Sequence, residues 1–438
     1  MAPPRVARRH IQLGGAGTLS RHSVSAWSIP FARPALGAEE EQAVLRVLRS
    51  GWLTTGNEAA AFEAEFAKAV GASQAVAVSS ATAALHLGLE ACGVGPGDLV
   101  ATPSYSFVAS AHAIRHAGAE PLFVDIEAAS CNLDPHEVER ACRELGTRAR
   151  GEGGGRLPRV AAILPVHVAG LPCDMEALQR IARRYSLPIV EDAAHAFPTD
   201  TGSGFAGAIG DCGAYSFYAN KTITTGEGGM LVCADPATAE QVRALRLHGI
   251  DRPVWQRERR VGAGASGSVG GSGSGQVARV ADYDVIALGY KYNLPDTAAA
   301  IGRAQLRKAT ALTEQRRRIA DRYLAELGRC PGLRMPVGHP GHAWHLFIVQ
   351  IEDGAAVDRD ELAAQLAADG IATSVHFPPL HLTSYYRQRP APSRWQEALA
   401  NTEQCAARTL SLPLFPALTE EEQSYIIARL RAILGADS

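Results

Sequence analysis

The sequence predicts an α/β protein: a mainly parallel central sheet with helices on both faces, plus a smaller C-terminal α+β domain. Three observations support this prediction. Short apolar runs alternate with amphipathic segments from residue 75 to about residue 190, which is the pattern of βαβ crossovers. The pattern changes after Pro295, where a long helical region begins. The 438 residues also exceed one average domain, so two lobes are expected.

Two helices are expected before the alternating region. Glu39 to Leu48 reads as an amphipathic helix with Val44, Leu45 and Leu48 on one side. A loop bounded by glycines follows at 51–56, and Asn57 can cap the next helix, which runs to Gly71.

The alternating region then predicts strands and helices in turn. Strands are expected at 75–78, 99–102, 121–124, 160–166 and 187–190, and helices at about 83–93, 108–116, 135–145 and 175–185. Beyond residue 295 we expect a helix at 297–327, a strand at 344–351, a helix at 360–368, a strand-like run at 371–377 and a final helix at 420–434. The large domain is therefore placed at 28–298 and the small domain at 299–438.

Composition excludes several classes of protein. Charged residues are a fifth of the chain and the formal net charge is -2, which argues against nucleic acid or an anionic membrane as the main partner. No apolar run approaches the roughly 20 residues that span a bilayer. Eight cysteines are scattered without a C-x-x-C pair. They predict neither a disulfide framework nor a metal site, and they suit a reducing cytoplasm.

Three stretches differ from the rest of the chain. Residues 1–27 are basic, contain serine and lack acids. A disordered tail or an over-called start codon is expected, although transit peptides share this composition. Residues 148–156 are rich in Gly and Arg, and residues 261–275 are almost entirely Gly, Ser and Ala. Both are expected to be flexible surface loops.

The most informative stretch surrounds Lys221, the only Lys or Arg between Arg184 and Arg243. It lies among Ser, Thr, Gly and aromatic residues, between two apolar strand-like runs. Burial lowers the pKa of a lysine, and a neutral amine can form a Schiff base with a carbonyl compound. A lysine that reaches to water from a strand end is the alternative.

Further segments supply parts of a pocket for pyridoxal 5'-phosphate (PLP). Ser80, Ala81 and Thr82 join a strand to a helix, where free N–H groups can bind a phosphate. Ser216, five residues before Lys221, can close on the same phosphate. An ordinary serine N-cap is the alternative for Ser80.

Two of these segments would contact the cofactor ring. Asp192 ends a buried strand and can pair with the pyridine nitrogen of PLP. His195 can contact the ring, and Phe107, after another strand end, can stack on it. A helix cap for Asp192, a structural histidine and a core phenylalanine are the alternatives.

Taken together, the motifs resemble the fold-type I PLP enzymes, and among them the DegT/DnrJ/EryC1/StrS sugar aminotransferases. The resemblance runs from about Ile29 to the C-terminus. The matching motifs are S-G-W-L-T-T-G (50–56), S-S-A-T-A-A-L (79–85), P-V-H-V-A-G (165–170), V-E-D-A-A-H-A (190–196), S-F-Y-A-N-K-T-I-T-T-G-E-G-G-M (216–230), L-R-L-H-G-I (245–250) and G-Y-K-Y-N-L-P-D (289–296). The branch that aminates 4-keto nucleotide sugars, which includes the UDP-4-amino-4-deoxy-L-arabinose synthases, also has A-W-H-L-F and V-H-F-x-x-L-H, here at 343–347 and 375–381.

The resemblance implies a role for each matched position. Lys221 would hold PLP as a Schiff base and shuttle the proton. Asp192 would pair with the pyridine nitrogen, and His195 would lie beside the ring. Thr82, the Ala81 backbone and Ser216 would hold the phosphate, and Phe107 would stack on the ring. Asn293 would reach the PLP phosphate of the neighbouring subunit, which implies a homodimer with shared sites.

The implied reaction moves an amino group from L-glutamate to a nucleotide-linked keto sugar, most simply at carbon 4. Trp52, His376 and His381 are candidates for the sugar-nucleotide pocket, with core or surface roles as alternatives. Antibiotic or 3-keto sugar pathways and a non-catalytic PLP-binding protein are the other functions considered. One departure is the hairpin at 197–205, which lacks the Lys or Arg usual in the family.

Overall fold

The computed structural model describes residues 27–147, 159–251, 283–389 and 399–436. The predicted tail up to residue 26 and the predicted loops at 148–156 and 261–275 lie outside the described residues. Within the described part, no helix is both long and apolar enough to cross a membrane.

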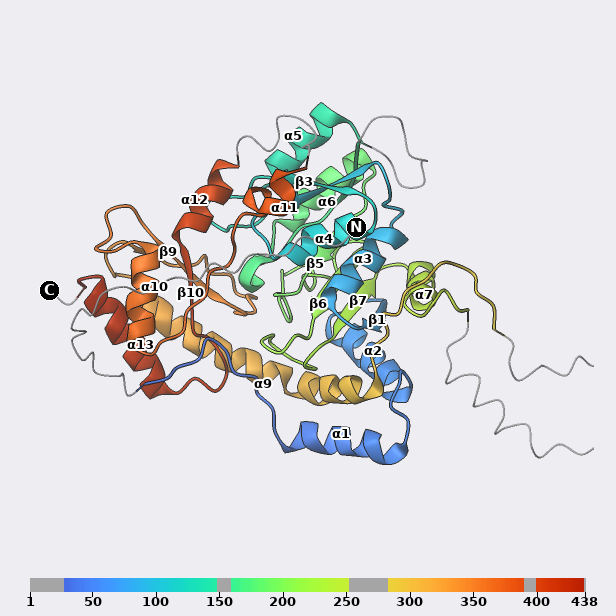
Figure 1. Cartoon of the computed structure of the whole chain (residues 1–438), viewed down its shortest axis with the longest axis horizontal. Coiled ribbons are helices and arrows are strands. Elements are labelled where there is room, and N and C mark those ends of the chain that lie inside the picture. Colours follow the sequence, from blue (N-terminus) through green and yellow to red (C-terminus); the bar gives the residue numbers. More distant parts are fainter. Residues whose placement is uncertain (1–26, 148–158, 252–282, 390–398, 437–438) are drawn as a thin grey trace, which may run out of the picture.

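A seven-stranded sheet forms the centre of the large domain (Figure 1). Its strands are β1 (Gln74–Val78), β2 (Asp98–Pro103), β3 (Glu120–Val124), β4 (Arg159–Ile163), β5 (Val190–Asp192), β6 (Cys212–Ser216) and β7 (Gly229–Cys233). Four strands lie in the order β1-β7-β6-β5 and three in the order β3-β2-β4. Parallel bridges from Ile163 to Ile189 and from Val166 to Asp192 join the two groups. Strand β7 is antiparallel to both neighbours and the other strands run parallel, so the predicted fold class is confirmed.

Helices cover both faces of this sheet because adjacent residues of each strand point in opposite directions. Val100 belongs to the core beneath α3 (Ala81–Ala91), α4 (Val108–His116) and α7 (Pro236–Leu245). Its neighbours Leu99 and Ala101 belong to the core beneath α5 (Pro135–Leu145) and α6 (Met175–Tyr185).

The C-terminal part is an α+β unit with its own core. Its three-stranded antiparallel sheet has the order β10-β9-β8, from β8 (Leu333–Arg334), β9 (Phe347–Ile351) and β10 (Thr409–Leu412). Its helices are α9 (Asp296–Leu327), α10 (Arg359–Ala368), α11 (Ser384–Arg387), α12 (Ala400–Arg408) and α13 (Glu420–Ile433). Helix α9 packs against the large domain at its start and contributes Ile319 and Tyr323 to the C-terminal core.

The strand predicted at 371–377 is wrong. Only isolated bridges form there, from Ile371 to Ile29 and from Ser374 to Ser411. Two prolines, Pro378 and Pro379, follow directly and lack the N–H that a ladder needs. The segment is therefore an extended loop, which leads to the active site.

The two N-terminal helices, α1 (Ala38–Ser50) and α2 (Asn57–Ala69), also differ from expectation. Helix α1 buries Ala43 and Val47 against small residues of α9, while Leu45 and Leu48 stay exposed. Helix α2 is capped by Asp296 rather than Asn57. The Asp296 carboxylate accepts hydrogen bonds from the backbone N–H groups of Gly56 (2.7 Å), Glu58 (3.2 Å) and Ala59 (3.0 Å).

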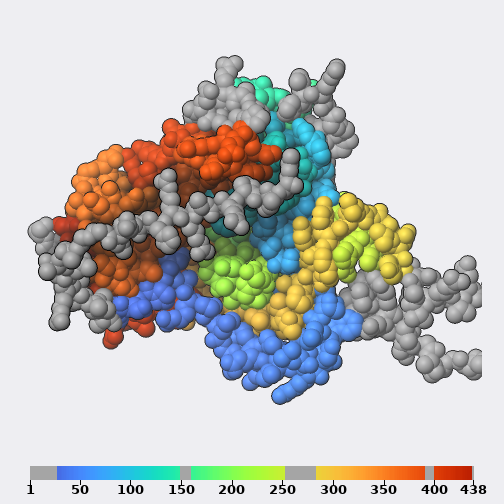
Figure 2. Space-filling view, in the orientation of Figure 1, coloured from blue at the N-terminus to red at the C-terminus, as the bar shows by residue number. Residues whose placement is uncertain are grey.

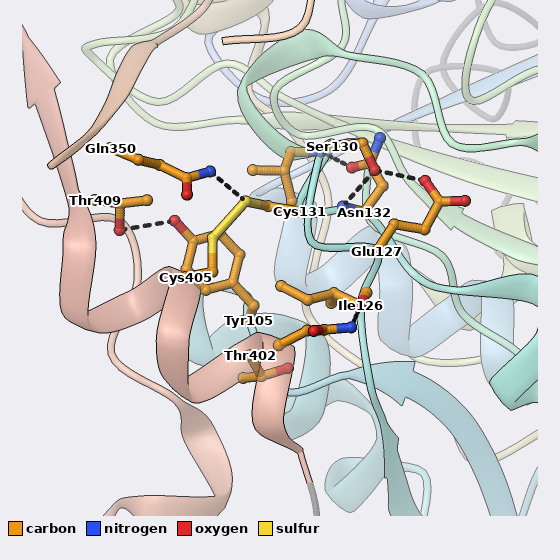
Figure 3. Close-up of a disulfide and its surroundings, with 12 residues drawn as sticks. Tyr105, Ile126, Glu127, Ser130, Cys131, Asn132, Gln350, Thr402, Cys405 and Thr409 are labelled. Carbon is orange, nitrogen blue, oxygen red and sulfur yellow. Dashed lines mark hydrogen bonds between the residues drawn. A yellow bond between two sulfur atoms is a disulfide. The ribbon is translucent and has the colours of Figure 1, made fainter. Parts of the chain in front are cut away.

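A disulfide joins Cys131 to Cys405, which contradicts the prediction from cysteine spacing. Cys131 lies on the loop after β3 and Cys405 on α12, as Figure 3 shows. The two are 274 residues apart in sequence, so only the docking of the C-terminal unit brings them together. The same loop holds α12 through Asp125, which accepts the backbone N–H groups of Asn401 and Thr402. The cysteines therefore no longer support a reducing compartment.

Candidate active site

Lys221 lies in the turn between β6 and β7, at the edge of the central sheet, and is partly buried. Burial lowers the pKa of Lys221 to about 8. Asp192 opposes this shift, and the buried cation Arg316 adds to it. A lysine with this pKa is a neutral amine above about pH 8, well below the range of an ordinary lysine, and Schiff-base chemistry requires the neutral amine.

Asp192 ends β5 and is 6% exposed. Its carboxylate accepts hydrogen bonds from the Ser110 hydroxyl (2.7 Å) and the Ala194 backbone N–H (3.1 Å). Burial raises the pKa of Asp192, and these donors together with Lys221 and His167 oppose the rise. A buried carboxylate beside a lysine amine can pair with a protonated heterocycle.

A small turn at the end of β1 begins helix α3. The Ser80 hydroxyl caps this helix by accepting the backbone N–H of Ala83 (3.1 Å), so the N-cap alternative for Ser80 is correct. Gly229 lies directly behind the turn, because a Cβ on it would come within 2.4 Å of the Ser80 carbonyl carbon. A glycine is therefore required there for the close approach.

Ser216 belongs to the same turn region. It pairs in register with Gly229, and Gly229 pairs with Val78 at the end of β1. The sheet thus brings Ser216 beside the segment of Ser80, Ala81 and Thr82, although about 135 residues separate them in sequence. The hydroxyl-bearing residues Thr82 and Ser216 and the backbone N–H groups at the start of α3 therefore share this end of the sheet, and such a donor set fits a phosphate.

Aromatic and histidine rings gather near Lys221. His195 lies 4.4 Å from His345 and stacks 5.7 Å from Phe377, measured between ring centroids. Phe377 lies 6.4 Å from Phe107, whose side chain is 60% exposed. Burial, with Lys221 and His376 adding to it, holds the pKa of His195 well below its usual value, so this ring is neutral. The exposed ring of Phe107 can stack on a planar ligand.

Asn293 lies beside Val78, and its side chain donates to the Thr55 hydroxyl (2.8 Å) and accepts from Lys291 (2.6 Å). Trp52 belongs to the same region, where its indole N–H donates to the Thr55 carbonyl (3.4 Å).

The other two substrate candidates lie in the C-terminal part. Burial, with the charge of Lys221 adding to it, lowers the pKa of His376 to about 4. The ring contacts the Ser411 hydroxyl (2.8 Å). The two ring nitrogens of His381 contact Ser104 (2.7 Å) and Glu403 (3.2 Å), as expected for its structural alternative.

Three residues that act on Asp192 or Lys221 were not identified from the sequence: Ser110, Arg316 and His345. Ser110 lies in the first turn of α4, the helix that follows Phe107. His345 is part of A-W-H-L-F, a motif that the sequence already linked to this branch. Arg316 carried no signal, because it lies within a run of three arginines on a long helix.

The residues therefore fit PLP: an amine for its aldehyde, a buried carboxylate for its ring nitrogen, a phosphate turn and an exposed ring. A family model described as the DegT/DnrJ/EryC1/StrS aminotransferase family matches residues 34–431. The chain belongs to this family. Its members are PLP-dependent aminotransferases, so this chain is an enzyme of that class with PLP as cofactor.

Individual relatives agree. The chain is 39% identical over 415 residues to the spore coat polysaccharide biosynthesis protein SpsC of Bacillus subtilis, which covers 93% of this chain and 98% of that protein. The PLP form of Spr1654 from Streptococcus pneumoniae, a putative sugar aminotransferase, is 28% identical with a TM-score of 0.78, covering 94% of this chain and 99% of that one. DesI, solved in the presence of its TDP-sugar product, is 29% identical with a TM-score of 0.77, covering 93% and 94%.

Proposed function

We propose that this aminotransferase moves an amino group from L-glutamate to the keto group of a nucleotide-linked sugar, at carbon 4, for the synthesis of a surface polysaccharide or glycoconjugate. The observation that carries the proposal is the meeting of Lys221, Asp192 and the phosphate turn at one sheet edge in a chain of this family. The polysaccharide role of SpsC and the TDP-sugar product of DesI support a sugar-nucleotide substrate.

Bound PLP would supply an electron sink that makes a carbon–hydrogen bond of the substrate acidic. The Lys221 Nζ, neutral above about pH 8, can take that proton and return it to a neighbouring carbon. Asp192 would keep the ring nitrogen protonated. Thr82, the Ala81 backbone and Ser216 would hold the phosphate, while the Ser80 hydroxyl caps helix α3. Phe107 would stack on the ring, and His195 would lie beside it.

The sugar-nucleotide pocket would open beside these groups. Trp52 and His376 stay candidates for it. Trp52 and Asn293 both form hydrogen bonds with Thr55, and His376 is within electrostatic reach of Lys221. Both ring nitrogens of His381 are already engaged, so we leave it outside the proposed pocket. The hairpin after Phe197 forms, with a bridge between Asp200 and Phe205, but it offers no cation to a diphosphate.

The decisive experiment supplies purified enzyme, PLP and L-glutamate with UDP-, GDP- and dTDP-linked 4-keto and 3-keto sugars, and detects amine products by mass. Amination of a 4-keto nucleotide sugar is expected. Amination of only 3-keto sugars would favour the antibiotic-type alternative. A PLP spectrum that no amino donor changes would refute transamination and favour a non-catalytic PLP-binding role.

We also propose a homodimer with shared active sites. The segment 283–288, beside α7, exposes Tyr283, Val285, Ile286 and Leu288, the last at 89%, and it stands out from the surface in Figure 2. An apolar segment this exposed is expected to be covered by a second copy. Asn293 follows five residues after Leu288, so the segment would carry Asn293 toward the neighbouring PLP phosphate. A cytoplasmic location stays a prediction.

Sedimentation equilibrium tests the dimer. Leu288→Asp is expected to weaken association, because it would place a charge in the covered surface. Val337→Asp, at another exposed apolar side chain, is the matched control and should leave the mass unchanged. A monomeric native protein, or equal weakening by both variants, would contradict this assignment.

A further inference from the structure

The C-terminal part of the chain supplies a direct contact to the lysine. The His345 Nε2 lies 3.4 Å from the Lys221 Nζ. The His345 side chain is buried, and its Nδ1 has no hydrogen-bond partner among the described residues. The distance is long for a hydrogen bond, as catalytic contacts often are before ligands bind.

The backbone of this histidine is fixed from two directions. The His345 N–H donates to the carbonyl of Ala169, in the large domain, at 3.0 Å. The Arg316 Nη1 of helix α9 donates to the carbonyls of Trp344 (3.3 Å), His345 (3.2 Å) and Leu414 (3.0 Å). Charged donors give strong hydrogen bonds, so Arg316 anchors the segment that carries the ring.

The histidine is also in the protonation state that the contact requires. Burial, followed by the charges of Lys221 and Arg316 and the neighbouring His195, holds the pKa of His345 well below its usual value. A neutral imidazole can accept a hydrogen bond at Nε2. The lysine amine or ammonium can donate it.

Two other histidines face the lysine, but their Nδ1 atoms are engaged. The His195 Nδ1 accepts the backbone N–H of Ala169 (3.3 Å), and the His376 Nδ1 contacts the Ser411 hydroxyl (2.8 Å). Of these three rings, His345 is the one in contact with Nζ.

We propose that His345 is a positioning residue for Lys221, anchored by Arg316. Its Nε2 accepts a hydrogen bond from Nζ whenever the lysine is not joined to the cofactor, and this contact directs the amine toward the site between Asp192 and the phosphate turn. The proposal rests on the aminotransferase class of the chain and not on the identity of the sugar.

The chain has four lysines, Lys68, Lys221, Lys291 and Lys308, so the reactivity of each can be followed separately. Protein freed of PLP is treated with trace acetic anhydride across pH 6–11, and acetylation at each lysine is measured by mass spectrometry. Exposed Lys68 is the internal reference. The labelling midpoint of Lys221 in the native chain is expected near 8.

His345→Leu removes the acceptor and leaves little room for water. Because an acceptor stabilises an ammonium more than an amine, the Lys221 midpoint should fall by about half to one pH unit. In His345→Gln, the amide oxygen can reach the Nε2 position, so the midpoint should return to within about 0.3 unit of native. His342→Leu disturbs the same segment without touching the lysine, since His342 bonds the Trp344 N–H, and should leave the midpoint unchanged.

A second readout is the rate at which the PLP-free protein captures added PLP, followed by visible absorbance. His345→Leu should slow capture at a pH above both labelling midpoints, where the amine is neutral in each protein and only its orientation differs. If His345→Leu proves unfolded, His345→Asn replaces it, because its shorter amide reaches only the Nδ1 position and should fail where Gln succeeds. The proposal would be overturned if His345→Leu changed neither the labelling midpoint of Lys221 nor the rate of PLP capture. It would also be overturned if His342→Leu changed them equally. If no nucleotide-linked keto sugar is aminated but the Lys221 midpoint still falls in His345→Leu, the proposed substrate is rejected and the role of His345 stands.

Discussion

Reduction of the Cys131–Cys405 disulfide should destabilise the chain without altering the PLP residues. The cross-link closes a loop of 274 residues. The chain-entropy model assigns a loop of this length about 5–6 kcal/mol, and removal of native disulfides typically costs about 2–5 kcal/mol. If all 438 residues unfold together, about 4 kcal/mol corresponds to a fall in Tm of about 4 °C.

The assay combines a thiol count with calorimetry. Denatured native protein should show six free thiols before reduction and eight after it, because the other six cysteines are free. Reductant should lower the Tm of the native protein. Cys405→Ser should begin at the lower Tm and should not respond to reductant. Eight thiols in unreduced protein, or an equal response to reductant in Cys405→Ser, would refute the reasoning.

Three further predictions concern the site and its support. Lys221→Ala should abolish the absorbance of the protein–PLP Schiff base and lower turnover by at least about 10²–10⁴-fold, because the proton shuttle is lost; a Schiff-base band that persists after PLP addition and removal of free PLP would exclude Lys221 as the attachment point. Asp192→Asn keeps the shape but removes the charge that pairs with the ring nitrogen, so PLP affinity measured by equilibrium dialysis should fall by about 10- to 150-fold, equivalent to about 1.5–3 kcal/mol; unchanged affinity would place the ring nitrogen elsewhere. Asp296→Ala leaves three backbone donors at the start of α2 without their acceptor and should cost about 2–4 kcal/mol in urea unfolding; Asp296→Asn, which keeps an oxygen in place, is the control and should lose less.

Local patterns predicted most of the large domain. Helices at 108–116, 135–145 and 175–185 have the predicted bounds. The last two are amphipathic and begin after the capping residues Asp134 and Asp174. The strand prediction at 371–377 failed because apolar residues alone do not supply a partner strand. Helix α1 buries Ala43 and Val47 rather than Leu45 and Leu48, because α9 presents small residues to it. No local sequence pattern shows this partner surface.

The candidate site, too, could be predicted only in part from the sequence. Lys221, Asp192, Ser216 and the turn at 80–82 could be predicted, because each lies at the end of a strand and parallel strands present those ends at one edge. The structure supplied what reaches this edge from elsewhere: Ser110 on Asp192, and Arg316 with His345 on Lys221.

The sequence by itself determined the fold class, and it placed Lys221, Asp192 and the turn at 80–82 as candidates at strand ends, because these depend on residue type and on spacing within one segment. Only the tertiary structure decided the cap of α2 by Asp296, the disulfide and the histidine at the lysine. Each of these contacts joins residues more than 100 positions apart. Their partners are selected by how the C-terminal unit docks, and docking is a property of packed surfaces rather than of any local period.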